Sequence, residues 1–436
     1  MIKVKKMFLI SGPIGPVIGS NQSFKNTLIE YLKSGYEVYH FAFFYRNSQK
    51  YNVKDFLKFK NYHFYGTPKV FEYIRNLISK KSTKKEISIP IPHPDAIIKP
   101  ESEITTFQSI FFIFYTIFES IRALLLALFI KPDLVYSYEV FSVIPGYLIK
   151  KIFKIPAAKR FQGTYLDYNN LNNKKLWFHK LAYKLKFNLV IMANDGTKGN
   201  KVLKKLGINK YLFLLNGLDD KIKEKVDEEK IKYLKEKHNL KEHYVLGIFN
   251  RFHPFKRIDR AIYLLKQTID NGINAKLLIG GMGGPMEDSL KKYAKELNVE
   301  KKIIWLGKIK YEEMKYYYKL CDVVLIVNDY ANTGNQILEV SYLGIPTIAT
   351  DDENNSKYLS FNNIYYVKPK EFSKNAIKGI LYFYNNKNKF NKNELKSWKE
   401  RMEIEIKEIE KILEEKNENT KFNRSKTTIY KRSSNK

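Results

Sequence analysis

Short apolar runs alternate with amphipathic helical segments along most of the chain. In the first half, the apolar runs are four to seven residues long, and helical patterns such as Ser23–Lys33 and Trp177–Lys184 separate them. This alternation is typical of parallel α/β domains. The strands predicted in the first half are Lys6–Ile10, Glu37–Phe43, Leu134–Tyr138, Ala157–Phe161, Leu189–Met192 and Tyr211–Leu215.

A second alternating series follows the turn-like linker Asn216–Asp219 and a charged helix predicted over Lys221–Lys237. A chain of 436 residues is too long for one ordinary core. We therefore predict two Rossmann-like, doubly wound α/β domains, residues 1–216 and 217–386, that face each other across a cleft where ligands bind. The strands predicted in the second domain are Tyr244–Phe249, Ala275–Ile279, Ile303–Leu306, Val323–Val327 and Thr347–Thr350.

Beyond residue 386 the sequence is strongly charged. Residues 387–415 are predicted to be mostly helical and to pack across the domains through one narrow apolar stripe. Residues 416–436 are polar and basic with no hydrophobic period, which predicts a disordered tail. The stripe consists of Trp398, Met402, Ile406, Ile409 and Leu413.

One apolar segment, Ser109–Ile130, has nearly the length of a membrane span. Glu119 and Arg122 interrupt its middle, and each central charge costs about 2.5–3.5 kcal/mol on insertion scales. A span would also place strands of one sheet on opposite sides of a membrane. We therefore favour a helix partly buried in the first domain over a true span, with one face dipping into an acidic membrane surface beside the surrounding Lys residues.

Charge and cysteine content narrow the classes of partner. The formal net charge of +32 favours anionic partners, although a compositional bias of the source explains it equally well. Nucleic acid is not the expected partner, since no zinc-ligand spacing, helix-turn-helix or RNA-binding aromatic strand stands out. The single cysteine, Cys321, fits a buried thiol in a reducing compartment, and no secretory signal is evident. We expect a cytoplasmic protein, peripheral at the inner face of the membrane.

Two cations follow the first predicted strand of the second domain. Arg251 and Lys256 lie five residues apart in a loop, and a helix is expected to begin near Arg257. Cations at the carboxyl end of a strand, beside a helix N-terminus, form a pyrophosphate site. Basic residues are common in this chain, so the position of these two carries the interpretation.

Residues 332–350 form a polar loop, a short apolar helix ending at Gly344, and a buried strand. Glu339 is the one carboxylate in that helix, and it either faces solvent or has a partner such as a ligand. In the first domain, Gly12, Gly15 and Gly19 follow the first strand and allow a close approach of the backbone to a ligand. Their spacing is not the G-x-G-x-x-G of dinucleotide-binding proteins.

Together these segments resemble family 4 retaining glycosyltransferases with the GT-B fold, a group that includes the bacterial phosphatidylinositol mannosyltransferases. The segment NRFHPFK matches the family pattern GRLvpeK, and ILEVSYLGIP matches lLEAmacGvP. The resemblance covers nearly all of residues 1–415 in order and is strongest over Gly247–Asp351. The matching segments are Gly19 with Ser34–Val38, Pro132–Tyr138, Asn216–Asp219, Asn250–Lys256, Leu278–Pro285, Trp305–Gly307 and Ile337–Pro346.

The resemblance implies transfer of a sugar, with retention, from a UDP- or GDP-sugar to a glycan or lipid-linked acceptor. Arg251 and Lys256 would be the catalytic pair that holds the donor diphosphate, and Glu339 would bind the ribose hydroxyls. The nucleotide-sugar would be a co-substrate, with no further cofactor. No metal is expected, because the chain has no Asp-x-Asp. The remaining donor contacts would be Gly19, Thr333, Gly334 and Asn335.

The chain departs from the family pattern at two places. Ala331 stands where the first glutamate of the family's motif is expected, and Gln162-Gly163 replaces a frequent His-Gly pair. Gln162 is therefore a candidate contact to the sugar or the acceptor. Two alternatives stay open: a catalytically inactive basic binding protein on the same fold, and a nucleotide-sugar epimerase.

Overall fold

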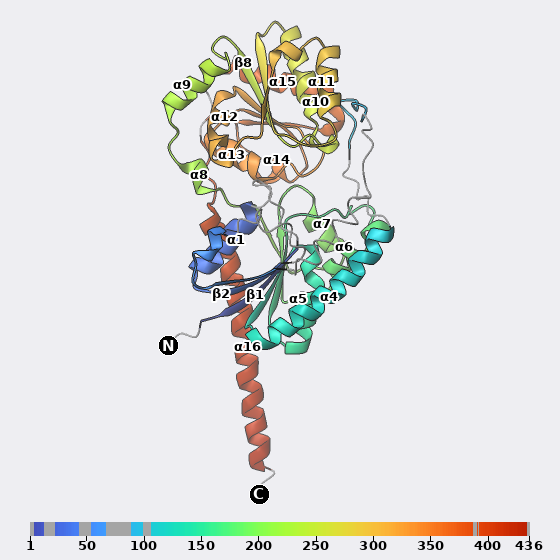
Figure 1. Cartoon of the computed structure of the whole chain (residues 1–436), viewed down its shortest axis with the longest axis vertical. Coiled ribbons are helices and arrows are strands. Elements are labelled where there is room, and N and C mark those ends of the chain that lie inside the picture. Colours follow the sequence, from blue (N-terminus) through green and yellow to red (C-terminus); the bar gives the residue numbers. More distant parts are fainter. Residues whose placement is uncertain are drawn as a thin grey trace.

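The structure is a computed structural model that describes residues 4–12, 22–42, 54–66, 89–98, 106–386, 390 and 392–433. It consists of two α/β domains and a long C-terminal helix that starts beside domain 2 and runs along domain 1 (Figure 1). The two domains each contain one parallel sheet, so the predicted α/β class with two Rossmann-like halves is confirmed.

The part of domain 1 that the structure describes contains a sheet of seven strands in the order β3-β2-β1-β4-β5-β6-β7. The predicted strands are all present, with ends that differ by one residue at most. A further edge strand, β3, escaped prediction because its sequence YHFY is short and lacks an apolar run. The strands are β1 (Lys6–Ser11), β2 (Glu37–Ala42), β3 (Tyr62–Tyr65), β4 (Leu134–Tyr138), β5 (Ala157–Phe161), β6 (Leu189–Ala193) and β7 (Leu212–Leu214).

Helices cover both faces of this sheet. Met7 and Leu9 of β1 pack against α1 and the C-terminal helix α16, whereas Phe8 and Ile10 pack against α4 and α5 on the opposite face. Among the described residues, the helices of domain 1 are α1 (Gln22–Lys33), α2 (Lys54–Leu57), α4 (Thr106–Ile130), α5 (Val143–Phe153), α6 (Trp177–Lys184) and α7 (Gly199–Lys205).

The sheet of domain 2 has six strands in the order β10-β9-β8-β11-β12-β13. The strand missed by the prediction is again the short edge strand, β13. The strands are β8 (Tyr244–Phe249), β9 (Ala275–Gly280), β10 (Ile303–Gly307), β11 (Val323–Ile326), β12 (Thr347–Thr350) and β13 (Ile364–Val367).

The charged helix predicted over Lys221–Lys237 is two helices, because two aspartates each begin a helix. The side chain of Asp219 accepts from Lys221 N, and that of Asp227 accepts from Glu229 N and Lys230 N. The helices of domain 2 are α8 (Asp220–Lys223), α9 (Glu228–Lys237), α10 (Ile258–Asp270), α11 (Glu287–Glu296), α12 (Met314–Leu320), α13 (Asn335–Leu343), α14 (Asn355–Tyr358) and α15 (Phe372–Asn385).

The C-terminal helix α16 (Trp398–Ser433) differs from the prediction at both ends. It begins at Trp398, not near residue 387, because Ser397 and Glu400 form a reciprocal capping box. It continues to Ser433 through the segment expected to be disordered. The sequence from Trp398 to Ser433 has no glycine or proline, so nothing in it stops a helix.

A buried ionic cluster joins α16 to domain 1. The carboxylate of Glu405 pairs with Arg160 of β5 at 3.3 Å and with Arg401. It also accepts hydrogen bonds from the hydroxyls of Tyr31 and Tyr136. Burial alone would raise the pKa of Glu405, but the two arginines outweigh it and lower that pKa. The predicted apolar stripe packs around this cluster, with Met402 and Ile409 fully buried.

We expect Glu405→Ala to destabilise the protein by about 3–5 kcal/mol, because it leaves two buried guanidinium groups without their carboxylate. Urea unfolding monitored by circular dichroism measures the loss. The control is Glu403→Ala, two residues away on the exposed side of α16, which should change the free energy of unfolding by less than about 0.5 kcal/mol. Equal effects of the two substitutions would contradict a structural role for the cluster.

Candidate active site

The loops that follow strands β5 and β6 of domain 1 contact the loops that follow β11 and β12 of domain 2. Thr333 N donates to Asp195 O at 3.1 Å, and the Tyr330 hydroxyl donates to Thr164 O. Glu353 pairs with two lysines of domain 1, Lys198 and Lys201. The carboxyl ends of the two sheets therefore meet where the sequence predicted a ligand site.

The structure brings Arg251 and Lys256 together in the loop after β8. Lys256 ends a short 3-10 helix, Pro254–Lys256, and its side chain is half-buried. Burial, and then the positive charge of Arg251, lower the pKa of Lys256 to about 8, while Asp195 of domain 1 acts in the opposite direction. Two cations that repel each other at the interface between the domains suit a ligand with two negative groups.

A glycine-rich turn supports this cation loop. Phe252 N donates to Gly283 O at 3.1 Å, and Met286 N donates to Phe252 O at 3.2 Å. A Cβ atom on Gly281 would lie 1.9 Å from Asn250 O, and both Gly281 and Gly284 have positive φ. The turn Leu278–Pro285 thus has glycines because its backbone touches the Arg251 loop.

Two carboxylates that the sequence analysis did not single out face the same region. Glu139 follows β4 and Asp195 follows β6. Burial, and then the charge of the neighbouring Asp195, raise the pKa of Glu139 to about 7. Burial, and then the charge of Asp352, raise the pKa of Asp195 to about 7. Polar residues directly after buried strands were the sequence signal for both.

Glu139 is held in an unusual conformation. Its backbone has φ 69° and ψ 165°, a region that side-chain-bearing residues rarely adopt. Its carboxylate accepts from Gln162 N at 2.7 Å. Burial, and then the charge of Glu139, raise the pKa of Tyr165, while Arg251 acts in the opposite direction. The unusual backbone conformation of Glu139 therefore occurs at the place where Glu139, Asp195 and Arg251 lie near one another.

Glu339 is buried in α13 with both carboxylate oxygens paired, so the solvent-facing interpretation is wrong. Tyr311 Oη donates to Oε1 at 3.0 Å and Tyr318 Oη donates to Oε2 at 2.9 Å. Burial raises the pKa of Glu339 to about 7 despite these bonds. Gln22, at the start of α1 in domain 1, donates to Tyr311 Oη at 2.6 Å. The glutamate thus lies next to domain 1.

The other predicted donor contacts have different surroundings. Thr333 is fully buried, and its hydroxyl donates to Asp352 at 2.9 Å. Gly334 caps α13, with nothing within 4 Å of an added Cβ. Asn335 donates to Gln22 and accepts from Asn216 at 2.8 Å. Gly19 lies outside the described residues.

Gln162 points toward the interior of domain 1. The amide orientation that satisfies its neighbours places the oxygen 3.0 Å from Arg160 Nε and 2.8 Å from Tyr138 Oη, and the nitrogen beside Ser23. Ala331, at the position of the missing glutamate, has φ 60°.

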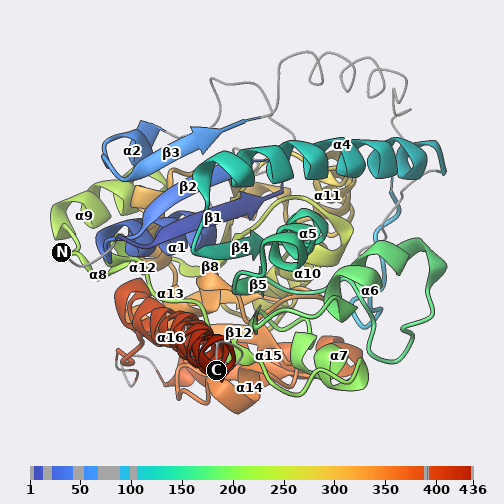
Figure 2. The same cartoon turned by 90° about the horizontal axis from the view of Figure 1, so that it is seen from below.

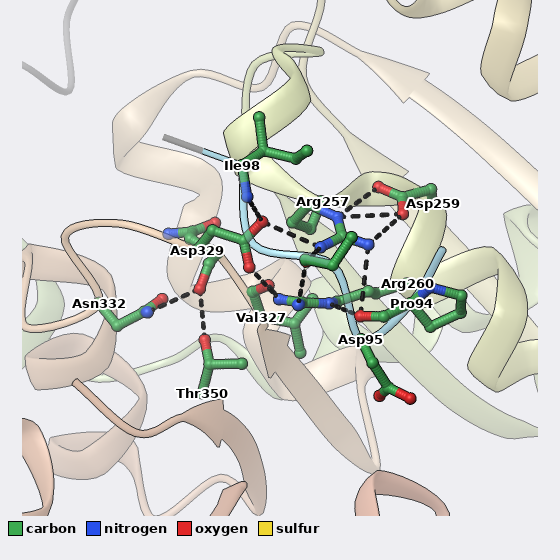
Figure 3. A network of polar contacts seen from close by, with 12 residues as sticks. Pro94, Asp95, Ile98, Arg257, Asp259, Arg260, Val327, Asp329, Asn332 and Thr350 are labelled. Atoms are coloured by element: carbon green, nitrogen blue, oxygen red, sulfur yellow. Dashed lines mark hydrogen bonds and ion pairs between the residues drawn. The ribbon is translucent and has the colours of Figure 1, made fainter. Parts of the chain in front are cut away.

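A segment of domain 1 binds the residues that directly follow the loop of Arg251 and Lys256. Residues 89–98, which we call the strap, lie between β3 and α4 in the chain but contact domain 2 (Figure 3). Arg257, next to Lys256, donates to His93 O at 2.9 Å, and Arg260 donates to Pro94 O at 2.8 Å. Both guanidinium groups are fully buried and pair with Asp329, at 2.9 and 2.7 Å.

Asp329 connects the strap to the two loops of the site. Its carboxylate accepts from Ile98 N of the strap at 2.8 Å, and its own N–H donates to Phe255 O at 3.0 Å. It also stands two residues before Ala331, at the beginning of the loop that leads to α13. The strap therefore orders the loop of Lys256 and the loop before Glu339 through one carboxylate.

Comparison with known proteins gives one match to a family model. Residues 230–402 match the family model described as Glycosyl transferases group 1. The match covers most of domain 2 and reaches the start of α16. A stretch of 77 residues is 36% identical to an uncharacterised glycosyltransferase of Methanocaldococcus jannaschii, and it spans 18% of this chain and 20% of that relative.

Two solved structures illustrate the likeness in fold. Anabaena Alr3699/HepE, in complex with UDP and glucose, aligns with a TM-score of 0.63 over 95% of this chain and 99% of that chain, at 14% identity. UDP-GlcNAc 2-epimerase of Methanocaldococcus jannaschii aligns with a TM-score of 0.53 over 92% and 98%, at 16% identity. Together with the two sheets, these likenesses show the GT-B fold.

We expect the stability of Glu139→Gln relative to the wild type to increase between pH 5 and pH 8. The folded-state pKa of Glu139 is raised from 4.5 to about 7. Its protonated side chain therefore stabilises the wild-type fold below pH 4.5, and this stabilisation is lost as the pH rises to 7. Glutamine stays neutral and keeps the bond from Gln162 N, and the gain should reach about 1–3 kcal/mol.

Urea unfolding at the two pH values measures this change. Glu403→Gln, on the exposed face of α16, is the matched control. A stability difference for Glu139→Gln that does not vary with pH would show that Glu139 is charged throughout this range.

Proposed function

We propose that this protein is a glycosyltransferase that moves a sugar, with retention and without a metal ion, from a UDP- or GDP-sugar to a glycan or lipid-linked acceptor. It would be a retaining hexosyltransferase-type enzyme of the EC 2.4 class. The observation that carries the proposal is the Arg251–Lys256 pair after the first strand of a Glycosyl transferases group 1 domain, facing domain 1. Relatives of the fold bind UDP and glucose, as Alr3699/HepE does.

The donor side of the reaction rests on the two cations and Glu339. In our proposal Arg251 and Lys256 bind the diphosphate and stabilise the negative charge that grows on it as the sugar C–O bond breaks. Each oxygen of Glu339 already accepts one tyrosine hydroxyl and retains a second lone pair. The two ribose hydroxyls would donate to these lone pairs, while Tyr311 and Tyr318 keep the carboxylate in place.

The acceptor side rests on the two carboxylates of domain 1. A new C–O bond forms as the acceptor hydroxyl loses its proton, and a group with a pKa near the working pH is suited to take that proton. Glu139 and Asp195 both have pKa values of about 7. We assign them to the acceptor hydroxyl because they lie on domain 1, opposite the cation pair.

The epimerase alternative keeps the fold but changes the chemistry, and the structural likeness to UDP-GlcNAc 2-epimerase is a reason to test it. The match to the Glycosyl transferases group 1 model favours transfer. Product analysis separates the two. An epimerase converts a nucleotide-sugar into its isomer without any acceptor, whereas a transferase releases the nucleotide and needs the acceptor.

The decisive experiment incubates the protein with a panel of UDP- and GDP-sugars and a membrane lipid extract, and follows sugar transfer and nucleotide release. We expect turnover with at least one donor and none with Lys256→Ala. Thermal stabilisation by single-stranded RNA, but not by UDP or GDP, would favour the inactive basic binding protein instead.

We expect Lys256→Ala to weaken binding of UDP, or of GDP if the panel selects it, by about tenfold to a hundredfold, as for loss of one charge-assisted hydrogen bond. The control is Lys301→Ala, which removes an exposed lysine before β10, at the amino ends of the strands. Isothermal titration calorimetry measures both. Unchanged affinity for Lys256→Ala would refute the assignment of the diphosphate site.

The pH dependence of this binding provides a further prediction. Because the pKa of Lys256 is lowered to about 8, its positive charge is lost between pH 7 and pH 9, and the affinity for the nucleotide should fall over that range. Lys256→Arg stays charged and should flatten the decrease. Identical pH profiles for the wild type and Lys256→Arg would show that another group controls binding.

A further inference from the structure

Helix α4 has its apolar side turned away from the protein. The side chains that face domain 1 include small or polar ones, such as Thr116, Ser120 and Ala123, and the larger Tyr115 and Ile130, all buried. The side chains on the opposite face are large and apolar, and each is more than half exposed, with Phe129 at 84%. These are Phe114, Ile117, Ile121, Leu125, Leu128 and Phe129.

The two charged residues of α4 lie on the face of the helix that is turned toward domain 1. Glu119 is fully buried and pairs with Arg122 at 2.5 Å, and Arg122 also donates to Gly66 O at 2.9 Å. They interrupt the apolar segment in sequence but leave its outer face uncharged. This arrangement is the reverse of a surface helix in water, where the polar face is outside.

The inner face of α4 is used by the fold. Ala123 and Ala127 are fully buried in a cluster with Phe8 and Ile10 of the central strand β1. The stretch Ile113–Ile130 is long and apolar enough to cross a membrane. If α4 crossed a bilayer, Ala123 and Ala127 would lose their contacts with the sheet. In the packed position, only the outer face of α4 can contact the apolar part of a membrane.

Lysines border the apolar face. Helix α5 lies beside α4 (Figure 2), and it presents Lys151 and the 58% exposed Ile152 to solvent. Lys154, after α5, and Lys131, directly after α4, are also exposed. A second copy of this chain would bring the same lysines against each other, whereas an anionic lipid surface complements them.

We propose that the outer face of α4, with Ile152 and the bordering lysines, docks in the plane of an acidic lipid bilayer. The apolar side chains enter the boundary between headgroups and acyl chains, and the lysines contact the anionic headgroups. Docking does not require the proposed transferase activity. If that activity holds, the membrane position places domain 1, which carries Glu139 and Asp195, toward a lipid-linked acceptor.

The test is flotation of the full chain with vesicles, in the absence of any nucleotide-sugar. We expect binding to vesicles of phosphatidylcholine with phosphatidylglycerol, and weaker binding to phosphatidylcholine alone. The variant Phe114→Ser/Leu125→Ser/Phe129→Ser should lose binding by more than about tenfold. The matched control, Leu57→Ser/Tyr233→Ser/Tyr382→Ser, removes three other exposed apolar side chains and should bind like the wild type.

A charge variant tests the lipid specificity. Lys151→Glu/Lys154→Glu should remove the preference for anionic vesicles, and Lys295→Glu/Lys301→Glu, on exposed lysines of domain 2, should keep it. Circular dichroism melting shows that each variant is folded. Wild-type binding by the α4 variant would overturn the proposal. So would a concentration-dependent dimer that the α4 substitutions abolish, because it would make a second copy the partner of this face.

Discussion

Two arginine side chains, Arg257 and Arg260, are fully buried beside each other and together require more acceptors than domain 2 supplies. Asp329 pairs with both, and Asp259 pairs with Arg257. Domain 2 adds the carbonyl of Val327, which accepts from Arg260, and the other acceptors are backbone carbonyls of the strap. Burial lowers the pKa of Arg260 to about 10, even with Asp329 opposing it. Unpaired buried charge is costly, so this constraint determines the position of the strap, of Lys256 and of the loop before α13.

Most of the fold follows from local patterns in the sequence. The buried parallel strands appear as continuous apolar runs, and Gly344 ends α13 with φ 68°, as a helix C-cap does. The predictions were wrong where a pattern was short or where capping competed with propensity. The edge strands β3 and β13 have four residues each, and the capping box at Ser397 begins α16 later than its charged composition suggested.

The candidate site was accessible from the sequence only in part. Arg251, Lys256 and Glu339 occupy recognisable segments, and their proximity to domain 1 follows from the fold. Glu139 and Asp195 are 56 residues apart in the chain, and only the strand order β4-β5-β6 brings their loops together. Their raised pKa values depend on burial and on neighbouring carboxylates, Asp195 for Glu139 and Asp352 for Asp195, and neither property is visible in a single segment. The partners of Glu339, the tyrosines of α12 and of the turn before it, are likewise a property of the packed domain.

Because of the strap, domain 2 is not an independent structural unit. The chain passes between the domains at residues 89–98, at the linker that follows β7, and at the start of α16, so no single cut separates two self-sufficient halves. Domain 2 alone would lack the strap carbonyls to which Arg257 and Arg260 donate. Recombination of this domain with a foreign partner would thus have to carry residues 89–98 along or replace both arginines. The strap and the two arginines should therefore be inherited together.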